Sequence, residues 1–429
     1  MNTHDDACRN LYLIQFAHRH PDFQHAELVS VMEMHKFSLR LLNADNNYGS
    51  FNQRIHCDKH ISSKEEDDVN VVWTHPLPNE KIARENNRVR PFLILSFHAS
   101  VPESRISECI SECVLVKSVL ELWSADVDMQ QCAAKLKATL FSPIDNSPSK
   151  LIRCHCMDEN KSWKITTQTF GSKYSKEEQD AMRAIFNFLP FAGPVNLDNP
   201  LNEFLLIREI EVNDLGSPIY PRHDHKRRII AENDSRPPLG VYFVRVCCGG
   251  SQSLRQGKVE KYSLKSRRYL GPTSMDSELS MIMTNLGQVK QGTFCFDPFV
   301  GTGSILVTCA LKGAYCFGTD IDIRVLKGRS DEENIFSNFD QYSLPRPELV
   351  RSDNSLYDRH YRTNNAIYDV ICCDPPYGVR AGTYFTLVTS FSRFRFDQFI
   401  NFNICQVHAN VVRKKIKFEK YCLNIDTIT

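Results

Sequence analysis

Residues 293–304 read Thr-Phe-Cys-Phe-Asp-Pro-Phe-Val-Gly-Thr-Gly-Ser, and this stretch decides the fold of the second half of the chain. Its apolar start is typical of a buried strand, and the apolar residues 305–312 have the pattern of a helix. Gly301 and Gly303 allow backbone amides to approach a ligand closely at the start of that helix. The sequence therefore predicts a strand, a ligand-binding loop and a helix, with Asp297 available to accept a hydrogen bond.

Further acidic residues follow the next predicted strands. Residues 314–319 form a second strand candidate before Asp320, and an acid at this distance from a glycine loop commonly binds a ribose. Asp322 is the alternative ribose partner, although it lies beyond the predicted strand end. Asp353 follows a third predicted strand. These acids extend the predicted ligand site along one edge of a sheet.

The tetrapeptide Asp374-Pro375-Pro376-Tyr377 follows a fourth predicted strand over residues 367–373. Proline has no N–H, so the groups of this turn are hydrogen-bond acceptors that suit an NH2 group. Tyr377 adds a flat apolar face on which a planar base could stack. Alone, such a tetrapeptide is more often a surface turn. Its place after a strand, downstream of the glycine loop, favours a site for an amine-bearing base.

This order of motifs resembles the S-adenosylmethionine-dependent methyltransferases that alkylate exocyclic amines of bases. The resemblance implies a Rossmann-like fold in which the glycine loop and the acids hold the cofactor, and the tetrapeptide holds the target amine. The implied cofactor-binding residues are Asp297, Pro298, Gly301, Thr302, Gly303, Asp320 and Asp353. The implied catalytic residues are Asp374, Pro375, Pro376 and Tyr377.

Composition limits the class of protein. The 429 residues are 42% hydrophobic and carry a net charge of +1, so the chain can bury sizeable cores but has no overall nucleic-acid signature. No apolar run is long enough for a membrane span, and residues 1–10 lack a secretory signal. The 16 cysteines suit reduced, buried thiols. We expect a cytoplasmic protein without a membrane partner.

Two groups of residues have the composition of metal ligands. They are Cys154-His155-Cys156 and His223-Asp-His225. Neither has the spacing of paired zinc ligands, and no second cysteine pair lies at a finger-like interval. The sequence therefore predicts no metal site.

Strand and helix patterns alternate in the first half of the chain. Strands are predicted over residues 11–17, 38–42, 91–97 and 114–123, with helices over residues 26–34 and 103–113. This β-α-β alternation predicts a ferredoxin-like α/β sandwich. Residues 43–90 are polar and read as an insertion, with a possible short strand over residues 69–73.

A second module follows. A strand is predicted over residues 163–170, a helix over residues 175–189 and another strand over residues 203–208. With Val195-Asn-Leu-Asp-Asn-Pro200 between them, they resemble a THUMP domain, an RNA-binding module of tRNA-modifying enzymes. Residues 265–279 are similar to the eukaryotic and archaeal enzymes that methylate the exocyclic amine of a guanine in tRNA. This resemblance implies tRNA position ten as substrate, a small zinc-ribbon activator subunit as partner, and no DNA.

Basic side chains near these modules are candidate phosphate contacts. They are Lys173, Lys176, Arg227, Arg228, Lys265, Arg267 and Arg268. An exposed basic face without RNA is an equally good interpretation of each. Trp123 and Trp163 lie in apolar segments and are predicted core residues.

The chain departs from the family pattern after Gly382. The 47 residues that follow include seven phenylalanines but no glycine or proline, and they are too few for the missing β-α-β units. We therefore expect an incomplete doubly wound sheet in which the strand over residues 367–373 lies at an exposed edge.

The resulting prediction is an α/β chain in three parts. Residues 1–212 form a ferredoxin-like and THUMP-like RNA-binding region, residues 213–382 the N-terminal half of a Rossmann-like methyltransferase, and residues 383–429 an atypical tail. The implied activity is methylation of a tRNA guanine amine. Two alternatives stay open: a non-catalytic tRNA- or partner-binding isoform, and a DNA adenine methyltransferase, which would not explain the THUMP-like module.

Overall fold

The computed structural model describes residues 9–17, 19–41, 68–80, 83, 90–142, 147–170, 174–210, 238–249, 254–272, 274–354, 367–374 and 403–406. The chain forms two compact units. The first unit comprises Met1–Gln24, His35–Ser111 and Leu115–Leu254, and the second comprises His25–Met34, Glu112–Val114 and Arg255–Thr429.

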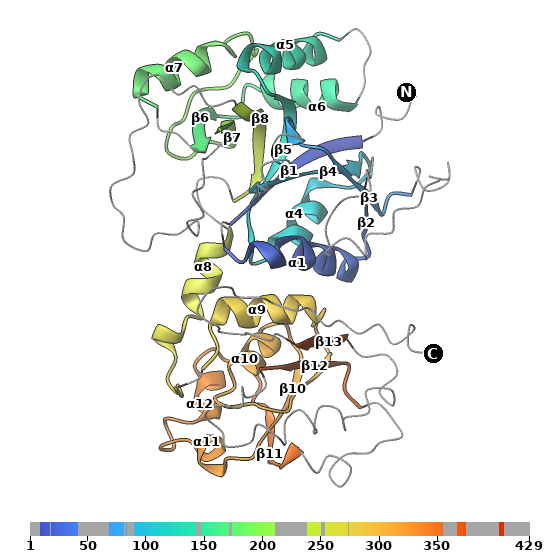
Figure 1. Cartoon of the computed structure of the whole chain (residues 1–429). Helices are drawn as coiled ribbons and strands as arrows, with labels where there is room; N and C mark the ends of the chain where they lie inside the picture. The colour runs from blue at the N-terminus through green and yellow to red at the C-terminus, as the bar shows by residue number, and fades with distance from the viewer. Residues whose placement is uncertain are drawn as a thin grey trace. The chain divides into compact units, whose positions relative to one another are not determined.

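The first unit is built on one eight-stranded sheet with the order β2-β3-β4-β1-β5-β8-β7-β6 (Figure 1). Its strands are β1 (Arg9–Phe16), β2 (Ser38–Leu41), β3 (Val71–His75), β4 (Phe92–His98), β5 (Val116–Asp126), β6 (Trp163–Phe170), β7 (Asn202–Ile210) and β8 (Pro238–Cys248). Its helices are α4 (Glu103–Ser111), α5 (Met129–Leu140), α6 (Ser147–Cys156) and α7 (Lys176–Ala184). Helix α1 (Pro21–Met34) begins in this unit and continues into the second.

The ferredoxin-like prediction is confirmed by strand pairing. β1 is antiparallel to both β4 and β5, and β3 is antiparallel to β4. With α1 and α4 as connections, this is the strand order of a β-α-β-β-α-β unit. β2 adds an edge strand, parallel to β3. The short strand predicted over residues 69–73 is β3, shifted by two residues.

The THUMP-like elements extend the same sheet. β6 is parallel to β7, and α7 lies between them in sequence. Ser175 caps α7 as predicted: its hydroxyl accepts the Glu178 N–H (3.2 Å), and the Glu178 carboxylate accepts the Ser175 N–H (2.6 Å). The helix ends at Ala184, earlier than predicted.

β8 was not predicted, and it joins the two modules. It is antiparallel to β5 on one side and to β7 on the other. The first unit therefore extends to Leu254, beyond the boundary at residue 212 that the sequence indicated. A fragment that ended at residue 212 would lack the central strand of the sheet.

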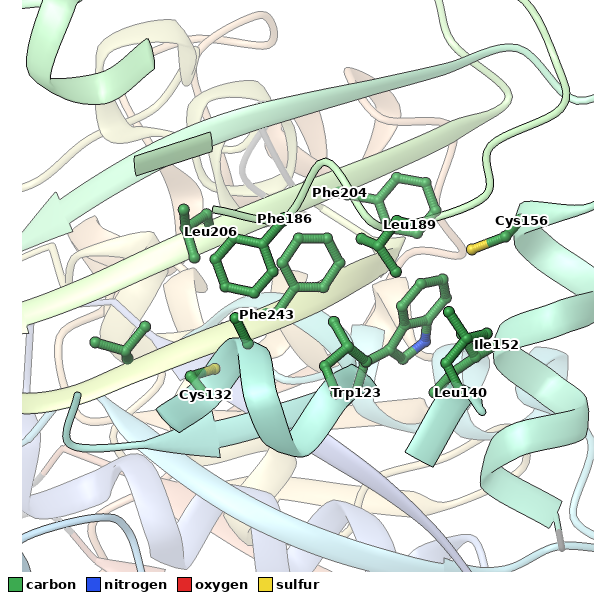
Figure 2. Close-up of a cluster of buried hydrophobic side chains, with 13 residues drawn as sticks. Trp123, Cys132, Leu140, Ile152, Cys156, Phe186, Leu189, Phe204, Leu206 and Phe243 are labelled. Carbon is green, nitrogen blue, oxygen red and sulfur yellow. The ribbon is translucent and has the colours of Figure 1, made fainter. Parts of the chain in front are cut away.

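An aromatic core fills the THUMP-like half of the first unit (Figure 2). The Phe186 and Phe243 rings stack with their centroids 4.8 Å apart, and the Trp123 and Phe204 centroids lie 4.9 Å apart. Helices α5 and α6 cover these rings with aliphatic and cysteine side chains. Trp123 is a core residue, as predicted, because only 7% of its surface is exposed.

A buried ion pair links segments far apart in the first unit. Arg90 Nε donates to Glu209 Oε1 (2.9 Å), Arg90 Nη2 donates to the other carboxylate oxygen, and Tyr242 Oη donates to that same oxygen (3.1 Å). All three side chains are buried. Because the two paired charges are buried, removal of one partner should be costly.

The second unit contains a parallel five-stranded sheet with the order β11-β10-β9-β12-β13 (Figure 1). Its strands are β9 (Phe294–Asp297), β10 (Tyr315–Asp320), β11 (Glu348–Arg351), β12 (Val370–Cys373) and β13 (Asn403–Gln406). Its helices are α9 (Ser277–Leu286), α10 (Ser304–Leu311), α11 (Ile323–Lys327) and α12 (Ile335–Asp340), with the 3-10 turn η3 (Leu264–Ser266) and most of α8 (Leu254–Lys261) before them. The strand order turns back at β9, as in doubly wound folds.

The prediction that β12 lies at an exposed edge is wrong. β13, which comes from the tail, pairs with β12 in parallel from Val370↔Asn403 to Cys373↔Gln406. The apolar strand that ends before Asp374 therefore has a neighbour on both sides, since β9 pairs with its other edge. The tail contributes to the sheet rather than standing apart from it.

We expect Glu209→Ala to lower the free energy of unfolding of the first unit by about 3–5 kcal/mol, because it removes the carboxylate that is paired with the buried Arg90. Urea unfolding followed by tryptophan fluorescence measures this, since all three tryptophans lie at positions 73, 123 and 163. Asp180→Ala, in a largely exposed ion pair with Arg183, is the control and should change stability by less than about 1 kcal/mol. Equal effects of the two variants would contradict the role of the buried pair.

Candidate functional site

The carboxyl ends of three adjacent strands each lead into an acidic residue. Asp297 ends β9, Asp320 ends β10 and Asp374 follows β12. β9 lies between the other two strands, and all three run parallel. Ligands of doubly wound folds bind in the crevice outside these strand ends, where the strand order reverses.

The loop after β9 has the backbone shape predicted from its glycines. Gly301 has φ +50° and Gly303 has φ +79°, and Gly303 is the N-cap of α10. A Cβ atom on Gly303 would lie 3.0 Å from Ile335 Cγ2, so there is no spare room for a side chain. Asp297 Oδ1 accepts the Phe299 N–H (2.9 Å), which fixes the start of the loop. The first amides of α10 have no intrahelical acceptor and are available to a ligand at the helix start.

Asp320 joins the second strand to this loop. One of its carboxylate oxygens accepts the Gly301 N–H (3.0 Å) and the other accepts the Asp322 N–H (2.9 Å). Asp322 instead caps α11 and pairs with Arg324, whose hydrogen bonds lower the pKa of Asp322 to about 2. Asp320 is therefore the acid that contacts the glycine loop, whereas Asp322 contacts α11 and Arg324.

Polar side chains that the sequence analysis missed hold Thr302. Its hydroxyl lies 2.7 Å from Ser274 Oγ, and its carbonyl accepts from Asn338 Nδ2 (3.2 Å). Asn338 is fully buried and also exchanges two hydrogen bonds with the backbone of Tyr269 (both 2.9 Å). The segment before α9 and helix α12 thus fix the loop from outside it.

Asn354 is a second residue that was missed. Thr319 Oγ1 donates to the Pro298 carbonyl (3.1 Å), and Asn354 contacts both of them. It therefore ties the segments after β9, β10 and β11 together. Asp353, one of the implied cofactor-binding residues, lies next to Asn354 in the sequence and is half-buried. The position of Asn354 just after the third predicted strand was the available signal.

The site is electrostatically negative. Only 1% of Asp297 is exposed, and burial raises its pKa well above the usual range, with the charges of Asp374 and Asp320 adding to the effect. The three acids stand at the carboxyl ends of the adjacent strands β10, β9 and β12. A ligand with a positive charge would offset their mutual repulsion.

The arrangement fits S-adenosylmethionine on this chain's own features. The positive-φ glycines give close backbone approach, Asp320 retains lone pairs for a hydroxyl, and the clustered acids complement the cofactor's sulfonium and amino groups. The carbonyl of Pro298 accepts the hydrogen bond from Thr319 Oγ1, and the cofactor contact predicted for Pro298 stays a prediction.

The predicted RNA contacts fall into three groups. Lys176, Lys265 and Arg268 are exposed. Arg267 is only 5% exposed, and its Nη1 donates to Ser304 Oγ (2.8 Å), so its predicted role as a phosphate contact does not fit. The third group, Lys173, Arg227 and Arg228, lies outside the described residues, as do the predicted catalytic residues Pro375, Pro376 and Tyr377.

The cysteines considered as zinc ligands point in different directions. Cys154 is exposed, whereas Cys156 lies in the aromatic core of the first unit. His155 is near Glu103 and Glu121, but Arg245 already pairs with both carboxylates. Burial, followed by the Arg245 charge, lowers the pKa of His155 to about 4.

No helix in the described ranges combines the length and apolar character needed to cross a bilayer.

Two domain families match the chain. The family described as the Tmrp11 THUMP N-terminal domain matches residues 82–233, and the family described as the RMKL-like methyltransferase domain matches residues 265–395. The second match includes the glycine loop and Asp374.

Similar proteins carry the name tRNA (guanine(10)-N(2))-methyltransferase. The protein from Bos taurus is 29% identical over 87% of this chain and 67% of its own length. The Homo sapiens protein is 33% identical over 68% of this chain and 58% of its own length. The Schizosaccharomyces pombe protein is 31% identical over 64% of this chain and 50% of its own length. The chain thus spans between half and two thirds of these relatives.

Solved structures are more distant. TrmN from Thermus thermophilus is 14% identical, with a TM-score of 0.35 over 73% of this chain and 79% of that chain. A predicted N6-adenine-specific DNA methylase from Listeria monocytogenes is 13% identical, with a TM-score of 0.36 over 79% of this chain and 88% of that chain.

The resemblance inferred from residues 163–208 and 265–377 is confirmed. Residues 82–233 are similar to the Tmrp11 THUMP N-terminal domain and residues 265–395 to the RMKL-like methyltransferase domain, and the chain is similar over most of its length to proteins named tRNA (guanine(10)-N(2))-methyltransferase.

Proposed function

We propose that this chain methylates the exocyclic amine of a guanine at position ten of tRNA, with S-adenosylmethionine as methyl donor. The observation that carries the proposal is the place of Asp374. It follows β12, the strand that pairs with β9, and β9 itself ends at Asp297, where the glycine loop starts. An acceptor for the target amine thus lies beside the cofactor loop.

The cofactor supplies a methyl group activated by positive sulfur, with a neutral leaving group. The protein's task is therefore placement. Gly301, Gly303 and the amides of α10 would hold the methionine end, and Asp320 would accept hydrogen bonds from the ribose. Asp374 would accept hydrogen bonds from the target amine and direct its lone pair toward the methyl group.

The proposed partners rest on different support. tRNA is supported by the THUMP domain and by the names of the relatives. The small zinc-ribbon activator subunit rests on the family resemblance alone. The cytoplasm is proposed from the many free cysteines.

A non-catalytic isoform is the second candidate, because the sheet is short. Among the described residues it has five strands, and β13 takes the place at the edge of β12. The two candidates share RNA binding and differ in methyl transfer, so activity separates them.

We expect Gly303→Ala to weaken S-adenosylmethionine binding by about tenfold or more, since a left-handed alanine is strained by about 1–2 kcal/mol and its Cβ would displace the loop from Ile335. Isothermal titration calorimetry measures the affinity. Gly292→Ala is the matched control, because Gly292 has φ +82° and no neighbour within 4 Å of an added Cβ. Equal binding losses in both variants would show that strain alone, not the loop, is responsible.

We expect Asp374→Ala to lower the rate of methyl transfer by about a hundredfold or more, because the amine loses its acceptor beside the cofactor. tRNA affinity should change little, since phosphate contacts dominate it. The assay measures methyl incorporation by the chain and by a version extended with the C-terminal part of a relative. Asp340→Ala, an exposed acid of the same unit, is the control.

Near-normal turnover by the extended Asp374→Ala variant would show that Asp374 does not take part in the reaction. If the unmutated chain were inactive and its extended version active, the non-catalytic candidate would be favoured.

We expect residues 1–254 to bind tRNA alone, with an affinity that falls at least about tenfold between about 50 and 200 mM salt. A shorter fragment of residues 91–212, limited to the THUMP-like elements and the strands before them, would lack β1 and β8, whereas residues 1–254 keep both strands. Filter binding measures the affinity, and Lys176→Glu should weaken it more than Lys150→Glu, an exposed lysine on α6. Salt-independent binding would contradict a phosphate-based interface.

A further inference from the structure

Three cysteine thiols meet in the interior of the second unit. Cys295 lies on β9, Cys309 on α10 and Cys372 on β12, and none of the three is exposed. Their sulfur atoms all lie within 4.8 Å of one another, and the Cys295 and Cys309 sulfurs are 3.3 Å apart. They come from positions far apart in the sequence, so spacing gave no sign of the cluster.

These thiols differ from Cys316, another buried cysteine of the second unit. The Cys316 thiol lies 3.4 Å from the Leu306 carbonyl, which is the usual backbone acceptor of a buried thiol. The three clustered thiols instead face one another, with the Thr284 hydroxyl 3.8 Å from the Cys309 sulfur. Thiolates are soft ligands, and three of them from three different elements could together bind one thiophilic ion.

The net charge of the ion and its three thiolates decides which ion the buried cluster can bind. A monovalent or divalent cation on three thiolates leaves a net negative charge, which is costly in the interior. The ionisable acid near this cluster is Asp297, which is itself buried and would oppose a further negative charge. A trivalent ion on three thiolates is neutral and needs no counter-charge.

We propose that Cys295, Cys309 and Cys372 form a binding site for a trivalent thiophilic metalloid, with arsenite as its probe. The reaction is As(OH)3 with three cysteine thiols to give As(S-Cys)3 and three water molecules. Three S–H and three As–O bonds break, three As–S and three O–H bonds form, and arsenic stays trivalent. Cys295 and Cys309 flank the glycine loop in the sequence.

The test is arsenite binding to the reduced, desalted chain, measured by native mass spectrometry and by titration of free thiols. We expect one arsenic atom per chain and the loss of three reactive thiols for each arsenic, with slow uptake because the sulfurs are buried. Cys309→Ala and Cys372→Ala should lose this arsenic. Cys316→Ala is the matched control, buried in the same unit, and should keep it.

Circular dichroism shows whether each variant is folded, and Cys295→Ser and Cys372→Ser replace any alanine variant that is not. Retention of arsenic by the cluster variants, loss of only two thiols per arsenic, or retention of Zn2+ in place of arsenic would each overturn the proposal. None of these outcomes depends on methyl transfer, so the result is independent of the proposed function.

Discussion

The carboxylate of Asp320 is the contact on which the site depends. It accepts hydrogen bonds from one amide of the glycine loop and from one amide beyond its own strand, so it links the segments that follow β9 and β10. Without it, a loop that contains two left-handed glycines would have many accessible conformations. A loop held in this way is preorganised to bind a cationic ligand.

The sequence was informative wherever structure follows from neighbouring residues. The strand, glycine loop and helix around Asp297 could be predicted because φ and period are local properties. Asn338 and Asn354 could not, because their partners lie far away in the sequence and asparagine in a polar segment has no distinguishing pattern. Arg267 shows the same limit. In a run of basic residues, only the fold reveals that one turns inward to Ser304 while Lys265 and Arg268 stay exposed.

The strands β8 and β13 illustrate how tertiary pairing outweighs local signals. The tail has neither glycine nor proline, so its composition gave no indication of a turn before a strand. An apolar strand such as β12 nevertheless presents unpaired backbone groups at its edge, and β13 satisfies them. β8 likewise fills a place between two strands that local patterns had assigned to separate modules.

The position of β8 also sets the order in which the first unit can be completed during synthesis. β5 and β7 emerge from the ribosome first, and each keeps an unpaired edge until Pro238–Cys248 has followed. Sheet closure must therefore wait for a strand about 110 residues downstream of β5, and such long-range pairing is slow. In that interval two apolar strand edges are open to other chains, which makes the nascent protein a natural client for chaperones.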